Sequence, residues 1–228
     1  MLKEKKLIIF DLDGTILDSA KSLANAINFT LDSLKREKIS EDTIRNWIGN
    51  GAQMLVKRAL VKKRDFDENE IDKELFEKAL KIFLDFYSKN LTNGSTLYPN
   101  VKNSLLKLKN SGYKLAIATN KPTKFIAPLL EFFEIKEFFD LYIGGDMVDK
   151  KKPHPMMLIE ISKRLRVDPK FIVMVGDSIN DLIAAKRANI DFIALTYGYH
   201  GEEEEFFKLE VKIKKFEEIL DILGIKNG

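Results

Sequence analysis

The sequence contains no cysteine and only two histidines, His154 and His200, among 228 residues. Without thiols there is neither a disulfide framework nor a thiolate metal site, and two histidines are few for a zinc site. We assign neither histidine a role. No apolar run approaches the ~20 residues that a membrane-spanning helix needs. We therefore expect no membrane partner and place the protein in the cytoplasm.

The sequence also lacks a large excess of one charge, since it contains 38 basic and 35 acidic residues and its net charge is +3. The lysines are interspersed with glutamates rather than gathered in a basic stripe, so we expect no nucleic-acid partner. Near the N-terminus the apolar stretch in MLKEKKLIIFDLDG is too short for a signal-peptide core. Apolar residues make up 45%, which suffices for one large domain or a domain with an insertion.

Short apolar runs recur along the chain, and most are continuous rather than alternating. This pattern is typical of parallel strands that are covered on both faces. Helical patterns separate the runs, which predicts an α/β fold with a doubly wound parallel sheet. The predicted strands are residues 7–10, 115–118, 141–143, 171–175 and 192–195.

The segment 18–90 breaks this alternation because it contains helical patterns and no convincing strand. We predict a helical insertion over 18–90, placed within a core made of residues 1–17 and 91–228. In the core, Pro128 lies within the apolar stretch TKFIAPLLEFF. Proline lacks the amide hydrogen that a helix interior needs, so we predict a helix that is broken or begins late there.

Polar side chains come soon after the ends of three predicted strands. Asp11 and Asp13 come after the first strand, Thr119-Asn120 after the second, and Asp177 after the fourth, with Asp181 four residues later. The carboxyl ends of parallel strands share one edge of the sheet, where ligands bind in open α/β folds. We therefore expect these groups to converge.

Several carboxylates at one point repel each other, and a hard divalent cation relieves the repulsion. Oxygen ligands without cysteine favour Mg²⁺. Lys152, in KKPHP, adds a positive charge, and the Thr119 hydroxyl with the Asn120 amide completes an anion site suited to phosphoryl transfer. Any one of these residues taken alone is explained more simply as a helix cap or a turn residue. The argument therefore rests on their combination and order.

The motifs DLDGT, ATN, KKPHP and GDSIND together resemble the four motifs of the haloacid dehalogenase superfamily, over nearly the whole chain. The resemblance implies a Rossmann-like core with a mobile α-helical cap domain inserted after the first strand. It implies a Mg²⁺-dependent phosphatase in which Asp11 is the nucleophile and forms an aspartyl-phosphate, while Asp13 is the general acid and base. The remaining implied residues are Asp11, Asp13, Asp177 and Asp181 for the metal, and Gly14, Thr119, Asn120 and Lys152 for the phosphate.

Further stretches resemble the phosphoglycolate phosphatases within this superfamily: WIGNGAQMLVKRAL, ATNKP, GDSINDLIAAKRAN and YGYHGE. The implied substrate is 2-phosphoglycolate, a small phosphorylated metabolite. Asn50 and Gly51 would approach it, and Arg58 or Lys57 would meet its carboxylate, although both cations are equally compatible with a solvated helix surface. A monomer and a homodimer both remain open.

Three alternatives also remain. The first is a phosphatase for another small phosphate, such as pyrophosphate, a sugar phosphate or a nucleotide. The second is a β-phosphoglucomutase-like phosphomutase, which would isomerise a phosphosugar without releasing phosphate. The third is a non-catalytic domain that only binds a phosphometabolite. The presence of all the motif residues argues against the third.

Overall fold

The computed structural model describes residues 2–199, 209 and 211–225, and the chain divides into two compact units. One unit combines the residues up to Asp18 with those from Leu97 onward, and the other spans Ser19–Thr96. The sequence-based division ended the insertion at residue 90. The second unit runs on to Thr96 because its last loop is bound to its first helix, where the Ser22 hydroxyl donates to the Leu91 carbonyl at 3.2 Å.

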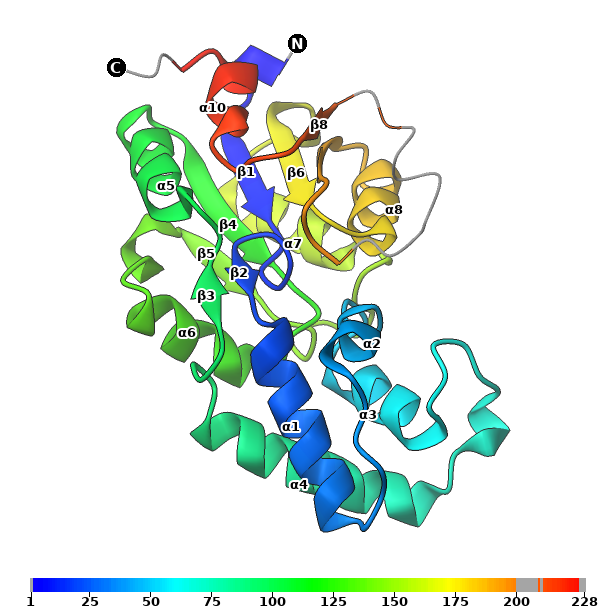
Figure 1. Cartoon of the computed structure of the whole chain (residues 1–228). Coiled ribbons are helices and arrows are strands. Elements are labelled where there is room, and N and C mark those ends of the chain that lie inside the picture. The colour runs from blue at the N-terminus through cyan, green and yellow to red at the C-terminus, as the bar shows by residue number, and fades with distance from the viewer. Residues whose placement is uncertain (1, 200–208, 210, 226–228) are drawn as a thin grey trace. The chain divides into compact units, whose positions relative to one another are not determined.

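The first unit contains a six-stranded sheet in which all paired strands are parallel, with the order β5-β4-β1-β6-β7-β8 (Figure 1). This confirms the α/β fold and the five strands expected from the apolar runs, with ends that shift by at most one residue. The strands are β1 (Leu7–Phe10), β4 (Lys114–Ala118), β5 (Leu141–Ile143), β6 (Ile172–Gly176), β7 (Asp191–Leu195) and β8 (Lys212–Ile213).

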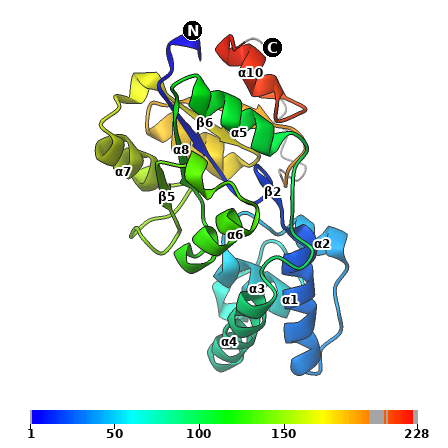
Figure 2. The same ribbon diagram turned by 90° about the vertical axis from the view of Figure 1, so that its left-hand side faces the viewer.

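Both faces of the sheet are covered, which is why its strands are apolar throughout. Every residue of β1 is fully buried. Leu7 and Ile9 belong to the core cluster under helices α7 (Met156–Leu165) and α8 (Ile179–Arg187). On the opposite face Phe10 stacks on Phe216, with ring centroids 5.5 Å apart. Figure 2 shows helices α5 (Val101–Asn110) and α10 (Glu218–Leu223) on that side.

Pro128 is the third residue of helix α6 (Ile126–Phe132), which follows a short 3₁₀ turn, Thr123–Phe125. The helix therefore begins late, as expected, because proline is tolerated in a first turn whose amide groups have no intrahelical acceptor. A small two-stranded sheet was not expected. It pairs β2 (Leu17–Asp18) with β3 (Thr96–Leu97), where the chain leaves the first unit and returns to it.

The second unit is built from four α-helices in its described part. They are α1 (Ala20–Ser33), α2 (Glu41–Arg45), α3 (Ala52–Val61) and α4 (Lys73–Lys89). The Ser40 hydroxyl caps α2 by accepting from the Thr43 amide. Phe83 of α4 is fully buried and stacks on Tyr87, with ring centroids 5.6 Å apart. Within the described ranges, no helix is both long and apolar enough to span a membrane.

Candidate active site

The strand order places β1 between β4 and β6, so their carboxyl ends are neighbours. Asp11 follows β1, and its amide continues the ladder by donating to the Val175 carbonyl of β6 at 3.0 Å. Thr119 follows β4, and Asp177 follows β6. The three strands therefore bring together groups that lie more than 150 residues apart in the chain, as the sequence pattern predicts.

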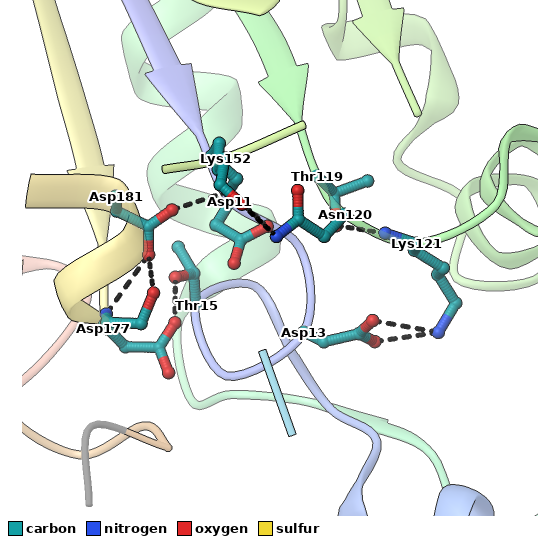
Figure 3. A network of polar contacts seen from close by, with 10 residues as sticks. Asp11, Asp13, Thr15, Thr119, Asn120, Lys121, Lys152, Asp177 and Asp181 are labelled. Carbon is teal, nitrogen blue, oxygen red and sulfur yellow. Dashed lines mark hydrogen bonds and ion pairs between the residues drawn. The ribbon is translucent and has the colours of Figure 1, made fainter. Parts of the chain in front are cut away.

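Three carboxylates gather at this edge. Asp11, Asp177 and Asp181 are buried, and each offers an oxygen within 4.8 Å of those of the other two. Local hydrogen bonds orient Asp181, because its Oδ2 accepts from both the amide (3.1 Å) and the hydroxyl (2.7 Å) of Ser178 at the start of α8. Figure 3 shows the carboxylates grouped beside Lys152.

Asp177 is held by two donors from distant parts of the chain. The Thr15 hydroxyl donates to its Oδ1 at 2.7 Å, and the Tyr199 amide donates to its Oδ2 at 2.5 Å. Two glycines make room for the side chain. A Cβ at Gly14, where φ is +88°, would lie 2.1 Å from Asp177 Oδ2, and a Cβ at Gly198 would lie 2.3 Å from that side chain. Gly14, assigned from the sequence to the phosphate, thus leaves space that the Asp177 carboxylate occupies.

Lys152 is the cation of the cluster. Its ammonium lies 2.5 Å from Asp181 Oδ1 and 3.0 Å from Asp11 Oδ1, and its side chain is 1% exposed. Burial lowers the pKa of Lys152, but Asp11 and Asp181 outweigh this effect and leave the pKa raised, so the ammonium stays charged. The Asn120 side chain donates to the Lys152 carbonyl at 2.9 Å and fixes this segment.

One ammonium does not balance three buried carboxylates. Burial raises the pKa of Asp11 to about 6, and burial followed by the charges of Asp11 and Asp181 raises the pKa of Asp177 well above its ordinary value. Asp11 Oδ1 is buried and, beyond the ion pair with Lys152, accepts no hydrogen bond from the described residues. A divalent cation with oxygen ligands would relieve this excess charge, so the donor set fits Mg²⁺.

Asp13 makes a different contact. The Lys121 ammonium donates to both of its carboxylate oxygens, at 2.9 and 3.0 Å, and the two side chains are 13% and 3% exposed. In Figure 3 the Asp13 carboxylate points toward Lys121 and away from Asp11. Sequence reasoning missed Lys121, because one lysine among 38 basic residues has no distinguishing pattern. Its position two residues after Thr119, at a strand end, was the available signal.

Asn50, Gly51 and Arg58 lie together in the second unit. Arg58 is buried, and its Nη1 donates to the Trp47 carbonyl at 2.6 Å and to Asn50 Oδ1 at 3.1 Å. Its Nε donates to the Arg64 carbonyl at 2.9 Å. Gly51 precedes helix α3 with φ of +85°. Through these hydrogen bonds Arg58 stabilises the second unit. A contact of Asn50, Gly51 or Arg58 with substrate stays a prediction.

His154 stands apart from this chemistry. The Nδ1 atom of His154 accepts from the Met156 amide at 3.3 Å, which agrees with a residue of a loop or first turn. His200 and the acidic run 202–205 lie outside the described residues.

Comparisons with known proteins agree with this geometry. Residues 8–195 match the model of the haloacid dehalogenase-like hydrolases. A phosphoglycolate phosphatase of Colwellia psychrerythraea is 46% identical over 220 residues, covering 96% of this chain and 97% of that protein. The enzyme of the same name from Psychrobacter arcticus is 46% identical, with 86% of each chain covered. The crystal structure of a predicted phosphoglycolate phosphatase from Haemophilus somnus has a TM-score of 0.88 at 38% identity, covering 96% of this chain and 98% of that one.

Proposed function

The chain belongs to the haloacid dehalogenase-like hydrolases and is a phosphoric monoester hydrolase, and we propose that it cleaves 2-phosphoglycolate to glycolate and phosphate. The observation that carries the chemistry is the buried group of Asp11, Asp177 and Asp181 with Lys152, set beside Asp13. The substrate is supported by the names of the relatives, which match nearly the whole chain.

In the proposed reaction an Asp11 carboxylate oxygen attacks phosphorus as the bond between phosphorus and the ester oxygen breaks. Asp13, in its acid form, gives its proton to the departing glycolate oxygen. The product of this step is an aspartyl-phosphate on Asp11. Asp13 then takes a proton from a water molecule that attacks phosphorus, and the bond from phosphorus to Asp11 breaks. Phosphate leaves, and both aspartates return to their starting forms.

The phosphoryl oxygens would be held by the Thr119 hydroxyl, the Asn120 amide and the Lys152 ammonium. Lys152 is suited to this because Asp11 and Asp181 keep it charged in a buried position. The ligands proposed for Mg²⁺ are the carboxylates of Asp11 and Asp177 and the Asp13 carbonyl, with Asp181 close by. When bound, Mg²⁺ would offset charge on the phosphoryl oxygens, which otherwise repel an anionic nucleophile.

We further propose that the helical unit Ser19–Thr96 serves as the cap. A cap that closes over the substrate excludes water during the first transfer and must open to release products. Asn50, Gly51 and Arg58 are the residues of this unit that we assign to the substrate.

The test is phosphate release from a panel of esters with and without Mg²⁺. The panel holds 2-phosphoglycolate, pyrophosphate, glucose 1-phosphate, a nucleoside monophosphate and an aryl phosphate. We expect Mg²⁺-dependent preference for 2-phosphoglycolate. Preference for another ester would discard the substrate and keep the hydrolase, and isomerisation of glucose 1-phosphate without phosphate release would identify a mutase.

The mechanism is tested by Asp11→Asn, which should abolish turnover because an amide is a poor nucleophile and forms no stable phosphoryl ester. Asp221→Asn in α10, an exposed carboxylate, is the control and should keep wild-type activity. Activity of the Asp11 variant near that of the control would contradict the mechanism.

A further inference from the structure

The segment Tyr197-Gly198-Tyr199, part of the stretch YGYHGE, lies against the carboxylate of Asp177 and has no part in the chemistry proposed above. It follows β7, whose carboxyl end lies at the same edge of the sheet as those of β1 and β6. The Tyr199 amide donates to Asp177 Oδ2 at 2.5 Å, and a Cβ at Gly198 would lie 2.3 Å from the Asp177 side chain. The position of this segment therefore restricts one side of the carboxylate.

Two phenol groups attach the same segment to the loop that follows β1. The Tyr197 hydroxyl donates to the Thr15 carbonyl at 2.8 Å, and the Tyr199 hydroxyl donates to Asp18 Oδ1 at 2.8 Å. The Thr15 hydroxyl in turn donates to the other oxygen of Asp177 at 2.7 Å (Figure 3). Asp177 is thus held by two segments that are also bound to each other.

Tyr199 makes one of these contacts with its backbone and another with the tip of its side chain. Its amide binds the Asp177 carboxylate, and its hydroxyl, which is protonated at neutral pH, binds Asp18. The residue is 5% exposed, and hydrogen bonds in such surroundings are stronger than those in water. Because the ring is rigid and its surroundings are closely packed, a displacement at one contact is transmitted to the other.

Asp18 lies where the chain leaves the first unit. It is the second residue of β2, which pairs with β3 at the point where the chain returns, and the second unit begins at Ser19. Hinges consist of the few residues at which a moving domain joins the rest of the chain. For the proposed cap, Asp18 is such a residue.

We propose that Tyr199 is a positioning residue that couples Asp177, a proposed Mg²⁺ ligand, to the junction at Asp18. The contact with Asp18 keeps the Tyr199 amide on Asp177 Oδ2 and so limits rotation of the carboxylate. Fixing Asp177 by a cation stabilises the contact at Asp18 in return, because a coupling between two sites acts equally in both directions. The inference rests on the proposed function in one respect, the assignment of a divalent cation to Asp177.

Tyr197 is the other residue of the segment that could serve as this link. Its hydroxyl binds the backbone carbonyl of Thr15, three residues before Asp18. That contact holds the loop beside Asp177 and does not reach the junction. Tyr199 is the better candidate, because its own amide and hydroxyl join the two places directly.

The first test is calorimetric titration of the wild type, Tyr199→Phe, Asp18→Ala and the double variant with Mg²⁺. Tyr199→Phe removes only the hydroxyl and keeps the amide that binds Asp177. The Kd for Mg²⁺ should rise roughly 10-fold in Tyr199→Phe. In the Asp18→Ala background the same substitution should add nothing, because its contact is already absent. Tyr113→Phe, a partly exposed tyrosine before the amino-terminal end of β4, is the matched control and should keep the wild-type Kd.

The second test measures the coupling in the reverse direction, by amide hydrogen exchange of residues 17–20 with and without saturating Mg²⁺. The cation should slow exchange at this junction in the wild type and in Tyr113→Phe, and much less in Tyr199→Phe. A general loss of stability would not produce this result, because each comparison is made within one variant.

A rise in Kd of about 3-fold or more for Tyr199→Phe, absent in the Asp18→Ala background and accompanied by loss of the Mg²⁺-dependent protection, would support the proposal. A smaller rise, an equal rise in both backgrounds or unchanged protection would each overturn it. If circular dichroism shows that Tyr199→Phe is misfolded, the Kd and the exchange of Asp18→Ala decide by the same criteria.

The outcome for the proposed function is separate. A wild type that binds no Mg²⁺ would overturn this inference together with the metal assignment. Mg²⁺ binding without hydrolysis of 2-phosphoglycolate would refute the proposed substrate and leave the coupling to be decided by the two tests above.

Discussion

Asp11→Asn should make the metal-free protein more stable at neutral pH although it removes the proposed nucleophile. In the wild type Asp11 is buried, with a side chain that is 10% exposed, and its carboxylate lies near those of Asp177 and Asp181. Burial raises the pKa of Asp11 from 3.8 to about 6. An acid whose pKa is higher in the folded state destabilises the fold when it ionises. The cost is therefore absent below about pH 4, grows as pH rises, and is complete above about pH 6.

The size of the effect follows from that difference in pKa. A difference of roughly 2 units, at ~1.36 kcal/mol per unit, gives about 3 kcal/mol of stability lost between pH 4 and pH 7. Asparagine resembles the protonated carboxyl in size and in charge, so the variant avoids this loss. The unfolding free energy of Asp11→Asn should thus equal that of the wild type at pH 4 and exceed it by about 3 kcal/mol at pH 7.5.

The assay is urea unfolding of the wild type, Asp11→Asn and the control Asp221→Asn at pH 4, 5, 6 and 7.5 with a chelator present. Taking differences at each pH removes the contribution of the other carboxylates, which titrate in all three proteins. Adding Mg²⁺ at neutral pH should close or reverse the gap, because the cation binds the wild-type carboxylates in the folded state. A gap that is independent of pH, or a variant less stable than wild type at pH 7.5 in chelator, would refute the reasoning.

Two further substitutions probe the site and the helical unit. Gly198→Ala would place a methyl group 2.3 Å from the Asp177 side chain, so the Mg²⁺ concentration that gives half-maximal activity should rise about 10-fold or more. An unchanged Mg²⁺ titration would show that Asp177 does not need this space. Phe83→Ala should lower the unfolding free energy by about 3–5 kcal/mol, because Phe83 is fully buried and stacked on Tyr87. Phe132→Ala, at a side chain 61% exposed, is its control, and equal losses in urea unfolding would contradict the assignment of Phe83 to a packed core.

Much of the core unit could be predicted because its signals are local. A strand covered on both faces must be apolar along its whole length, and β1 is. The strand ends can be recognised because each apolar run is followed by a polar residue, namely Asp11, Thr119 or Asp177. Since parallel strands end at one edge, the convergence of these groups follows from the fold class alone. Pro128 marked the late start of α6 for an equally local reason, its missing amide hydrogen.

The limits of the helical unit were harder to predict from the sequence. The loop after residue 90 has the composition of a connector, and only its hydrogen bonds, such as that from Ser22 to Leu91, attach it to the second unit. The strands β2 and β3 have two residues each, which is too few to show a periodic pattern in the sequence.

Local pattern in the sequence determined the fold class, the strand ends and the set of carboxylates. Only the tertiary structure decided how those carboxylates are used. It pairs Lys121 with Asp13 across 108 positions of sequence, places Lys152 between Asp11 and Asp181, and brings the Tyr199 amide to Asp177. Such contacts depend on the paths of loops between elements. A single lysine or a backbone amide has no periodicity from which its partner could be inferred, whereas strands and helices repeat and so can be recognised.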